Sequence, residues 1–210
     1  MDAATWDERY RVAEYVWAIE PNRFVAEQVL PLEPGRALDL AAGEGRNAVW
    51  LAGRGWDVTA VDFAAEGMAK ADRLADDHGV GITTVVADVL THAIEAGAFD
   101  LVLLSYLQLP TQERLHVVRR ATAGVAPGGT LLIVAHDRSN LDRGYGGPQY
   151  PDVLYDVDET VAAIASVSGN VDDASGGLDL AVRAVVGRTV TKDGVDRVAL
   201  DTLVVARRPG

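Results

Sequence analysis

A glycine-rich loop links a strand-like apolar run to a helical pattern; it reads Asp39-Leu40-Ala41-Ala42-Gly43-Glu44-Gly45-Arg46-Asn47. Glycines at 43 and 45 let the backbone turn sharply and approach a ligand closely, where a Cβ atom would clash. The helix that follows directs unpaired N–H groups and a partial positive charge into the same place, which suits a carboxylate or a phosphate. This loop is therefore the first predicted ligand site.

Two classes of cofactor use a loop of this kind. The spacing Gly43-x-Gly45-x-x-Ala48 fits the relaxed dinucleotide fingerprint, and Asp62, at the end of the next strand-like run, is placed to hold a ribose in either class. Asp39 separates them, because a carboxylate four residues before Gly43 repels a pyrophosphate and attracts the ammonium and sulfonium groups of S-adenosylmethionine. The loop favours S-adenosylmethionine. A nicotinamide-dependent oxidoreductase and a non-catalytic cofactor-binding protein are the alternatives.

Methyl transfer from a sulfonium is an in-line displacement, so most of the protein's task is alignment and exclusion of water. A thiolate or chalcogen oxyanion attacks without a base, whereas an alcohol or amine needs one within hydrogen-bond reach. Polar residues that follow the predicted fourth and fifth strands are Ser105, Tyr106, His136 and Asp137. Histidine titrates near neutral pH, so His136 is the candidate catalytic base, with Asp137 or another carboxylate to orient it. A structural hydrogen-bonding role is the alternative.

Strands and helices alternate from residue 36 onward. Apolar runs at 37–41, 56–62, 82–87, 99–105 and 129–135 are predicted buried strands, the last preceded by a Pro127-Gly128-Gly129 turn. Helical patterns lie near 46–54, 65–78 and 111–124. Two further strand-like runs, 178–191 and 195–208, are joined around Lys192-Asp193-Gly194, which is a strong hairpin signal. We expect a doubly wound α/β fold, with a mostly parallel seven-stranded sheet, a terminal antiparallel hairpin and helices on both faces.

Two segments flank this alternation. Trp6, Tyr10, Ala13 and Trp17 fall on one helical stripe that ends before Pro21, and a second short helix follows, so residues 1–34 are a predicted helical cap. Residues 137–154 are rich in Gly, Pro and Tyr and follow the fifth strand directly. Long loops of this kind are functional or mobile, so we expect a substrate loop, with a disordered connection as the alternative. Its predicted contacts are Asp137, Tyr145, Gln149 and Tyr150.

Composition and charge narrow the classes of partner and of metal site that this chain can have. Thirty-one acidic residues against nineteen Lys and Arg give a formal charge of −12, which disfavours a nucleic-acid partner. The absence of cysteine excludes disulfides and thiolate metal sites, and the histidines show no metal-ligand pattern. No apolar run approaches the ~20 residues of a membrane helix, and no signal peptide is evident. We expect one domain over 1–210, a cytoplasmic location and a small-molecule substrate.

These residues also resemble a known family. The stretch LDLAAGEGRNAVWLAGRGWDVTAVDF is similar to the cofactor motifs of class I S-adenosylmethionine-dependent methyltransferases. Gly43-x-Gly45-Arg46-Asn47, followed by Leu51-Ala52, resembles the tellurite-resistance-type branch, and the W-x-x-R-Y element from Trp6 to Tyr10 is shared with that branch and with thiopurine-type enzymes. The resemblance spans roughly residues 5–140. One departure is Ala41, where the family usually has its first glycine.

The resemblance implies a role for each matching residue. Asp39 and the 41–45 backbone would hold the methionyl part, and Asp62 both ribose hydroxyls. Asp88 would accept from the adenine amine, with capping of a helix at Val89 as an alternative or additional role. The other residues implied to bind or border the cofactor are Trp6, Tyr10, Ala41, Gly43, Gly45, Arg46, Asn47, Phe63, Met68, Val89 and Tyr106. Met68 and the N-terminal aromatic stripe have core packing as their alternative.

Overall fold

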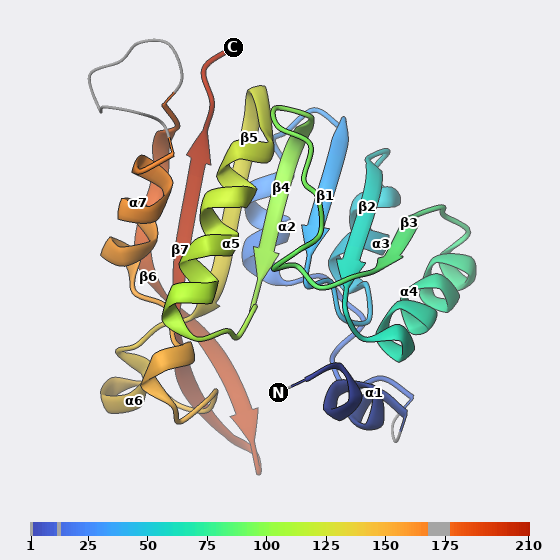
Figure 1. Cartoon of the computed structure of the whole chain (residues 1–210). Helices are drawn as coiled ribbons and strands as arrows, with labels where there is room; N and C mark the ends of the chain where they lie inside the picture. Colours follow the sequence, from blue (N-terminus) through green and yellow to red (C-terminus); the bar gives the residue numbers. More distant parts are fainter. Residues whose placement is uncertain (1, 12–13, 168–176) are drawn as a thin grey trace.

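The computed structural model describes residues 2–11, 14–167 and 177–210. A seven-stranded sheet in the order β3-β2-β1-β4-β5-β7-β6 forms its centre (Figure 1). Strands β3, β2, β1, β4 and β5 run parallel, and β7 pairs antiparallel with both β5 and β6. The strands are β1 (Arg36–Leu40), β2 (Asp57–Asp62), β3 (Thr83–Val86), β4 (Phe99–Ser105), β5 (Val125–His136), β6 (Asp179–Lys192) and β7 (Val195–Arg207). The predicted sheet and its terminal hairpin are confirmed.

Helices cover both faces of this sheet (Figure 1). One face packs against α2 (Arg23–Val29), α3 (Arg46–Ala52) and α4 (Ala65–His78), with α1 (Ala3–Arg11) beside α4. The other face packs against α5 (Thr111–Gly124) and α7 (Val157–Ala165). Successive residues of β4 enter opposite cores: Leu101 and Leu103 face α3, whereas Val102 and Leu104 face α5. Burial on both faces explains why these parallel strands are continuous apolar runs.

The N-terminal segment differs from the prediction. The first helix ends at Arg11, and Trp17 lies in irregular chain, so the helix does not run as far as Pro21. Ala13, the third member of the predicted stripe, lies outside the described residues. The second short helix is present as α2, because the Asn22 side chain accepts hydrogen bonds from the Phe24 and Val25 backbone N–H groups at its start.

Two further segments also differ. Strand β5 begins at Val125, so Pro127-Gly128-Gly129 lies inside the strand, where the register with β4 shifts between Phe99 and Leu101. A Cβ atom on Gly129 would lie 2.9 Å from the Phe99 carbonyl oxygen, so this irregularity requires glycine. The predicted loop at 137–154 contains a short helix, α6 (Asn140–Arg143), and a 3-10 turn, η1 (Pro151–Val153), so it has internal structure.

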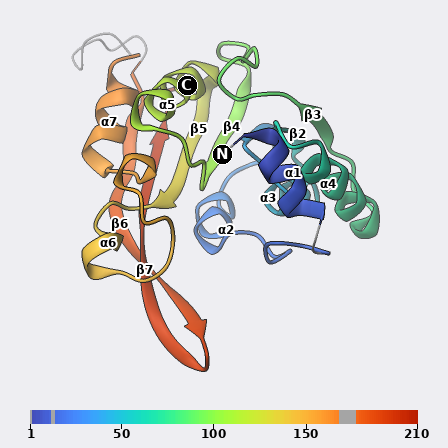
Figure 2. The ribbon, with the colours of Figure 1, turned by 60° about the horizontal axis from the view of Figure 1, so that its bottom comes forward.

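The terminal hairpin is long and turns tightly. Asp193 and Gly194 have φ values of 54° and 72°, which is the left-handed pair that an Asp-Gly hairpin turn requires. Figure 2 shows the end of the hairpin projecting beyond the rest of the sheet. The inner part of β7 lies against β5 and carries buried residues to the carboxyl end of that strand.

Ala41, the residue after β1, has a φ of 60° in the left-handed region. A non-glycine residue there costs roughly 1–2 kcal/mol, so the departure from the family's glycine is a source of strain.

Ala41→Gly should raise the free energy of unfolding by roughly 0.5–1 kcal/mol, measured by urea denaturation. This gain is what remains after subtracting the cost of the larger conformational entropy that glycine gives the unfolded chain. Ala42→Gly is the matched control, because Ala42 is not among the residues with positive φ. That control should lose stability; a loss in both variants would contradict the strain assigned to Ala41.

Candidate active site

The glycine-rich loop leaves the carboxyl end of β1 and enters α3 through three left-handed residues. Ala41, Gly43 and Gly45 have φ values of 60°, 59° and 79°. A Cβ atom on Gly45 would lie 2.5 Å from the Ala71 Cβ, so glycine there lets α3 and α4 meet. A Cβ atom on Gly43 would lie 3.0 Å from the Tyr10 hydroxyl. The two predicted glycines therefore serve close packing as well as the turn.

Asp39 is a buried carboxylate in β1, beside this loop. It is 1% exposed, and neither of its oxygens has a hydrogen-bond partner in the part of the chain that the structure describes. Burial raises the pKa of Asp39 to about 7, although the positive charge of Arg46 acts against this rise. Leaving a buried carboxylate unpaired is costly, so Asp39 stands out as a group that lacks its partner.

Asp62, at the carboxyl end of β2, is also buried but has partners. Its Oδ2 accepts from the Gly43 N–H and its Oδ1 from the Ala64 N–H, both at 2.9 Å. Burial raises the pKa of Asp62, and the two backbone hydrogen bonds oppose that rise. Each oxygen keeps a second lone pair for a further donor. Asp62 thus holds the glycine loop in place and remains able to accept from a ligand.

Aromatic side chains from the N-terminal helix lie over the loop. Tyr10 is buried, and a Cβ atom on Gly67 would lie 3.0 Å from both the Tyr10 ring and the Gly43 carbonyl oxygen. The Trp6 ring centroid is 5.3 Å from that of Tyr10 and 6.5 Å from that of Trp17. The W-x-x-R-Y element therefore meets the glycine loop, far away in sequence, by direct packing.

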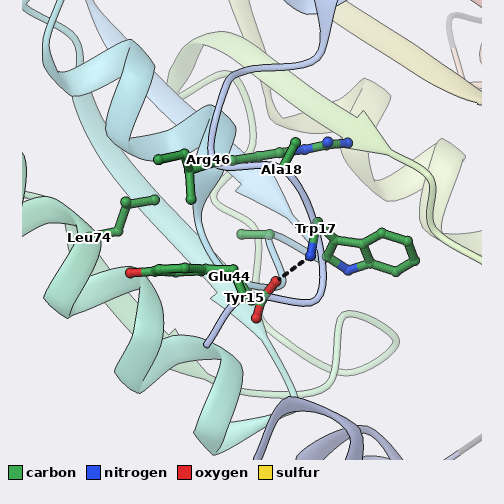
Figure 3. A pocket seen from close by; sticks show the side chains of 8 residues that line it. Tyr15, Trp17, Ala18, Glu44, Arg46 and Leu74 are labelled. Carbon is green, nitrogen blue, oxygen red and sulfur yellow. Dashed lines mark hydrogen bonds between the residues drawn. The ribbon is translucent and has the colours of Figure 1, made fainter. Parts of the chain in front are cut away.

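Glu44, between the two glycines, is a site residue that sequence reasoning missed. Its buried carboxylate accepts from the Val16 and Trp17 N–H groups at 3.0 Å and lies 2.8 Å from the Lys70 ammonium. These bonds hold residues 14–19 across the loop (Figure 3). Because the amides of residues 16 and 17 bind this side chain, these two residues do not continue the first helix. The variable position of a Gly-x-Gly pattern carries no signal for this role.

A small cavity remains between the loop and residues 14–19. Its volume is about 20 Å³, enough for one water molecule. It is lined by Tyr15, Trp17, Ala18, Ile19, Ala42, Glu44, Arg46 and Leu74 (Figure 3).

The other residues predicted at the cofactor occupy different environments. Asn47 is buried and its Oδ1 accepts from the Asn22 N–H at 2.9 Å. Phe63 is half-buried next to Asp62, whereas Met68 and Val89 lie in the hydrophobic cores. Asp88 is exposed and its side chain accepts from the Leu90 N–H. It therefore caps a turn, and not the helix at Val89 that was the alternative prediction. Their predicted cofactor contacts stay predictions.

Arg46 is half-buried at the start of α3. The structure shows no hydrogen bond or ion pair of its guanidinium with any residue in the described ranges. Figure 3 shows its side chain extending away from Leu74 and past Ala18.

The residues predicted on the substrate side divide into two groups. The His136 ring lies 4.8 Å from that of Tyr106, and its Nδ1 is 3.1 Å from Asp201 Oδ1. Asp137 is buried and accepts from Ser139 and Thr202, so Asp201, and not Asp137, is the carboxylate on His136. Asp201 was missed because only the pairing of β5 with β7 brings it to His136.

The predicted substrate loop passes close to His136. A Cβ atom on Gly147 would lie 3.1 Å from the His136 ring. Tyr145 contacts the Arg197 guanidinium, Gln149 donates to the Gly147 carbonyl oxygen, and Tyr150 is 74% exposed. Substrate contacts of these three side chains stay predictions. None of the described helices is long and apolar enough to span a bilayer.

Comparisons with known proteins find similarity to methyltransferases. Residues 37–129 match the family model described as a methyltransferase domain. Demethylmenaquinone methyltransferase of Thermus thermophilus is 29% identical over 134 residues, covering 63% of this chain and 61% of the relative. Ribosomal RNA small subunit methyltransferase C of Chromohalobacter salexigens is 31% identical over 121 residues, covering 52% and 35%. The chain thus spans less than two thirds of the length of these relatives.

A solved structure gives the same result for the fold. TehB from Haemophilus influenzae superposes with a TM-score of 0.70 at 17% identity, covering 90% of this chain and 62% of TehB. The seven-stranded sheet with its terminal antiparallel hairpin is the class I methyltransferase fold, residues 37–129 are similar to a methyltransferase domain, and the tellurite-resistance protein TehB is among the proteins that this chain is similar to.

Proposed function

We propose that this chain transfers a methyl group from S-adenosylmethionine to a small-molecule acceptor by in-line displacement. The observation that carries the proposal is Asp39, a buried carboxylate without a hydrogen-bond partner in the described chain, beside a glycine loop. A ligand with an ammonium and a sulfonium group supplies the positive charge that this site lacks.

The other residues around the loop fit the same ligand. Asp62 would accept from the ribose hydroxyls through the lone pairs that its two backbone hydrogen bonds leave free. Asp39 and Asp62 place two buried carboxylates beside the loop, whereas the charge of Glu44 is balanced by the Lys70 ammonium. A dinucleotide would bring a pyrophosphate into this negative field, so a nicotinamide-dependent oxidoreductase is disfavoured.

The N-terminal segment would close this site. Bound beside Asp39, S-adenosylmethionine supplies an electrophilic methyl group to whatever nucleophile is aligned with it. Tyr10 and residues 14–19 would cover the cofactor and exclude water, which favours displacement by the acceptor over hydrolysis.

The acceptor is a small molecule in this proposal. A formal charge of −12 opposes binding to phosphate backbones, although one relative is named as a ribosomal RNA enzyme. The Thermus relative is named for a demethylmenaquinone, which is a small molecule. A methyl-transfer screen over phenols, thiols, selenite and a short RNA tests the assignment; transfer to RNA alone would contradict it.

Asp39→Asn should stabilise the protein and weaken cofactor binding together. Since burial raises the pKa of Asp39 to about 7, the native state binds a proton that the unfolded chain releases, and stability falls as the pH rises from about 4 to about 7. At about pH 8 the variant should exceed the wild type in unfolding free energy by roughly 1–3 kcal/mol, and the gain should vanish near pH 4. Urea denaturation at both pH values measures it. A difference in unfolding free energy between variant and wild type that stays the same at both pH values would contradict a buried charge at Asp39. Asp57→Asn is the control, because Asp57 is exposed.

Asp62→Ala should weaken binding of S-adenosylhomocysteine by ~1–3 kcal/mol, measured by calorimetry, because hydrogen bonds to a charged group are lost. Asp57→Ala is the matched control, because Asp57 is an exposed carboxylate at the opposite end of the same strand. Unchanged affinity in Asp62→Ala would remove the ribose role. Binding of NADH without binding of S-adenosylhomocysteine would overturn the proposed function itself.

A further inference from the structure

Three strands and the residue that follows a fourth each contribute one polar side chain to a cluster near the carboxyl end of β5. His136 of β5 and Asp201 of β7 are register partners, and Nδ1 lies 3.1 Å from Oδ1. The other oxygen of Asp201 accepts from the Tyr106 hydroxyl at 2.7 Å and from Arg188 Nε at 2.9 Å. Tyr106 follows β4 and Arg188 belongs to β6.

The ionisation of this cluster follows from its hydrogen bonds. Burial acts to raise the pKa of Asp201, but hydrogen bonds from His136, Arg188 and Tyr106 outweigh it and lower that pKa. Asp201 is therefore a carboxylate, which only accepts, so Nδ1 of a neutral His136 ring must carry the hydrogen. The lone pair is then on Nε2, which has no hydrogen-bond partner among the residues in the described ranges.

A chain of side chains joins this cluster to the glycine loop. The Asn22 backbone N–H donates to Asn47 Oδ1 at 2.9 Å, and the Asn22 side chain donates to the Tyr106 hydroxyl at 3.4 Å. Asn47 belongs to the helix that leaves the loop, and the Tyr106 ring contacts the His136 ring. His136 thus lies at the same edge of the sheet as the unpaired Asp39 carboxylate, and its side chain is 16% exposed.

We propose that Asp201 is a positioning residue that fixes His136 as the catalytic base, and that the acceptor is a hydroxyl compound such as a phenol or an enol. This rests on the proposed function. A thiolate attacks without help, whereas a hydroxyl loses its proton during attack and needs a base. A histidine held in one tautomer by a fully buried carboxylate meets that need.

The step balances within these groups. As Nε2 takes the proton from the acceptor hydroxyl, the oxygen bonds to the methyl carbon and the methyl–sulfur bond breaks, with its electron pair remaining on sulfur. Asp201 stabilises the imidazolium that results, as a charge-assisted hydrogen bond, until the proton passes to water. Arg188 and Tyr106 both donate to the other oxygen of Asp201, so the carboxylate keeps its orientation.

The tautomer of His136 tests the positioning role without any reaction. Nitrogen-15 NMR of histidine-labelled protein, at a pH where the ring is neutral, should show hydrogen on Nδ1; His136→Asn identifies the signals among the four histidines. Asp201→Asn should shift the ring toward the Nε2–H tautomer. Asp137→Asn is the matched control and should leave the tautomer unchanged, because Asp137 binds Ser139 and Thr202. A wild-type ring with hydrogen mainly on Nε2 would overturn the proposal, even if Asp201→Asn failed to fold.

Methyl transfer to phenols and to matched aryl thiols tests the acceptor class. We expect transfer to a phenol, with kcat lowered about 100-fold or more in His136→Asn and Asp201→Asn, and unchanged binding of S-adenosylhomocysteine. Transfer only to thiols, or phenol transfer that both variants retain, would contradict the inference and leave the proposed function intact. If the wild-type protein does not bind S-adenosylhomocysteine, the proposed function itself is contradicted.

Discussion

One buried charge, the Asp39 carboxylate, sets the chemical character of the glycine loop. A group in this position is expensive for a folded chain, because burial disfavours its charged form and no described residue hydrogen-bonds to it. Around it the loop adopts left-handed backbone at Ala41, Gly43 and Gly45, and Asp62 holds the loop through the Gly43 amide. The unpaired charge is the feature that a cationic ligand would relieve.

The acceptor side is built by a different part of the fold. Parallel strands bring the glycine loop, Tyr106 and His136 to one edge of the sheet, which is where ligands bind in open α/β folds. The antiparallel hairpin then supplies Asp201 and Arg188 to the same edge. The terminal hairpin therefore has a chemical role in this chain, since it carries the carboxylate that orients the histidine.

The sequence predicted what depends on local pattern and on two-sided burial. Continuous apolar runs such as 99–105 identified the parallel strands, and Asp193-Gly194 identified the hairpin turn. It did not reveal contacts that only the fold creates. The Trp17 amide binds Glu44 instead of a helical carbonyl, and no local pattern predicts that contact. Asp201 could not be predicted either, because strand register, and not sequence spacing, places it beside His136. Pro127-Gly128-Gly129 resembled a turn but forms an irregularity within β5.

Proton release on cofactor binding tests the central claim most directly. Since the pKa of Asp39 is raised to about 7, this carboxyl group is protonated in a fraction of the molecules at neutral pH. An ammonium group bound beside it should expel that proton. Calorimetry with S-adenosylhomocysteine at about pH 7, in buffers of different ionisation enthalpy, should show net release that disappears in Asp39→Asn. Binding without release, or release that the variant retains, would contradict the role of this carboxylate.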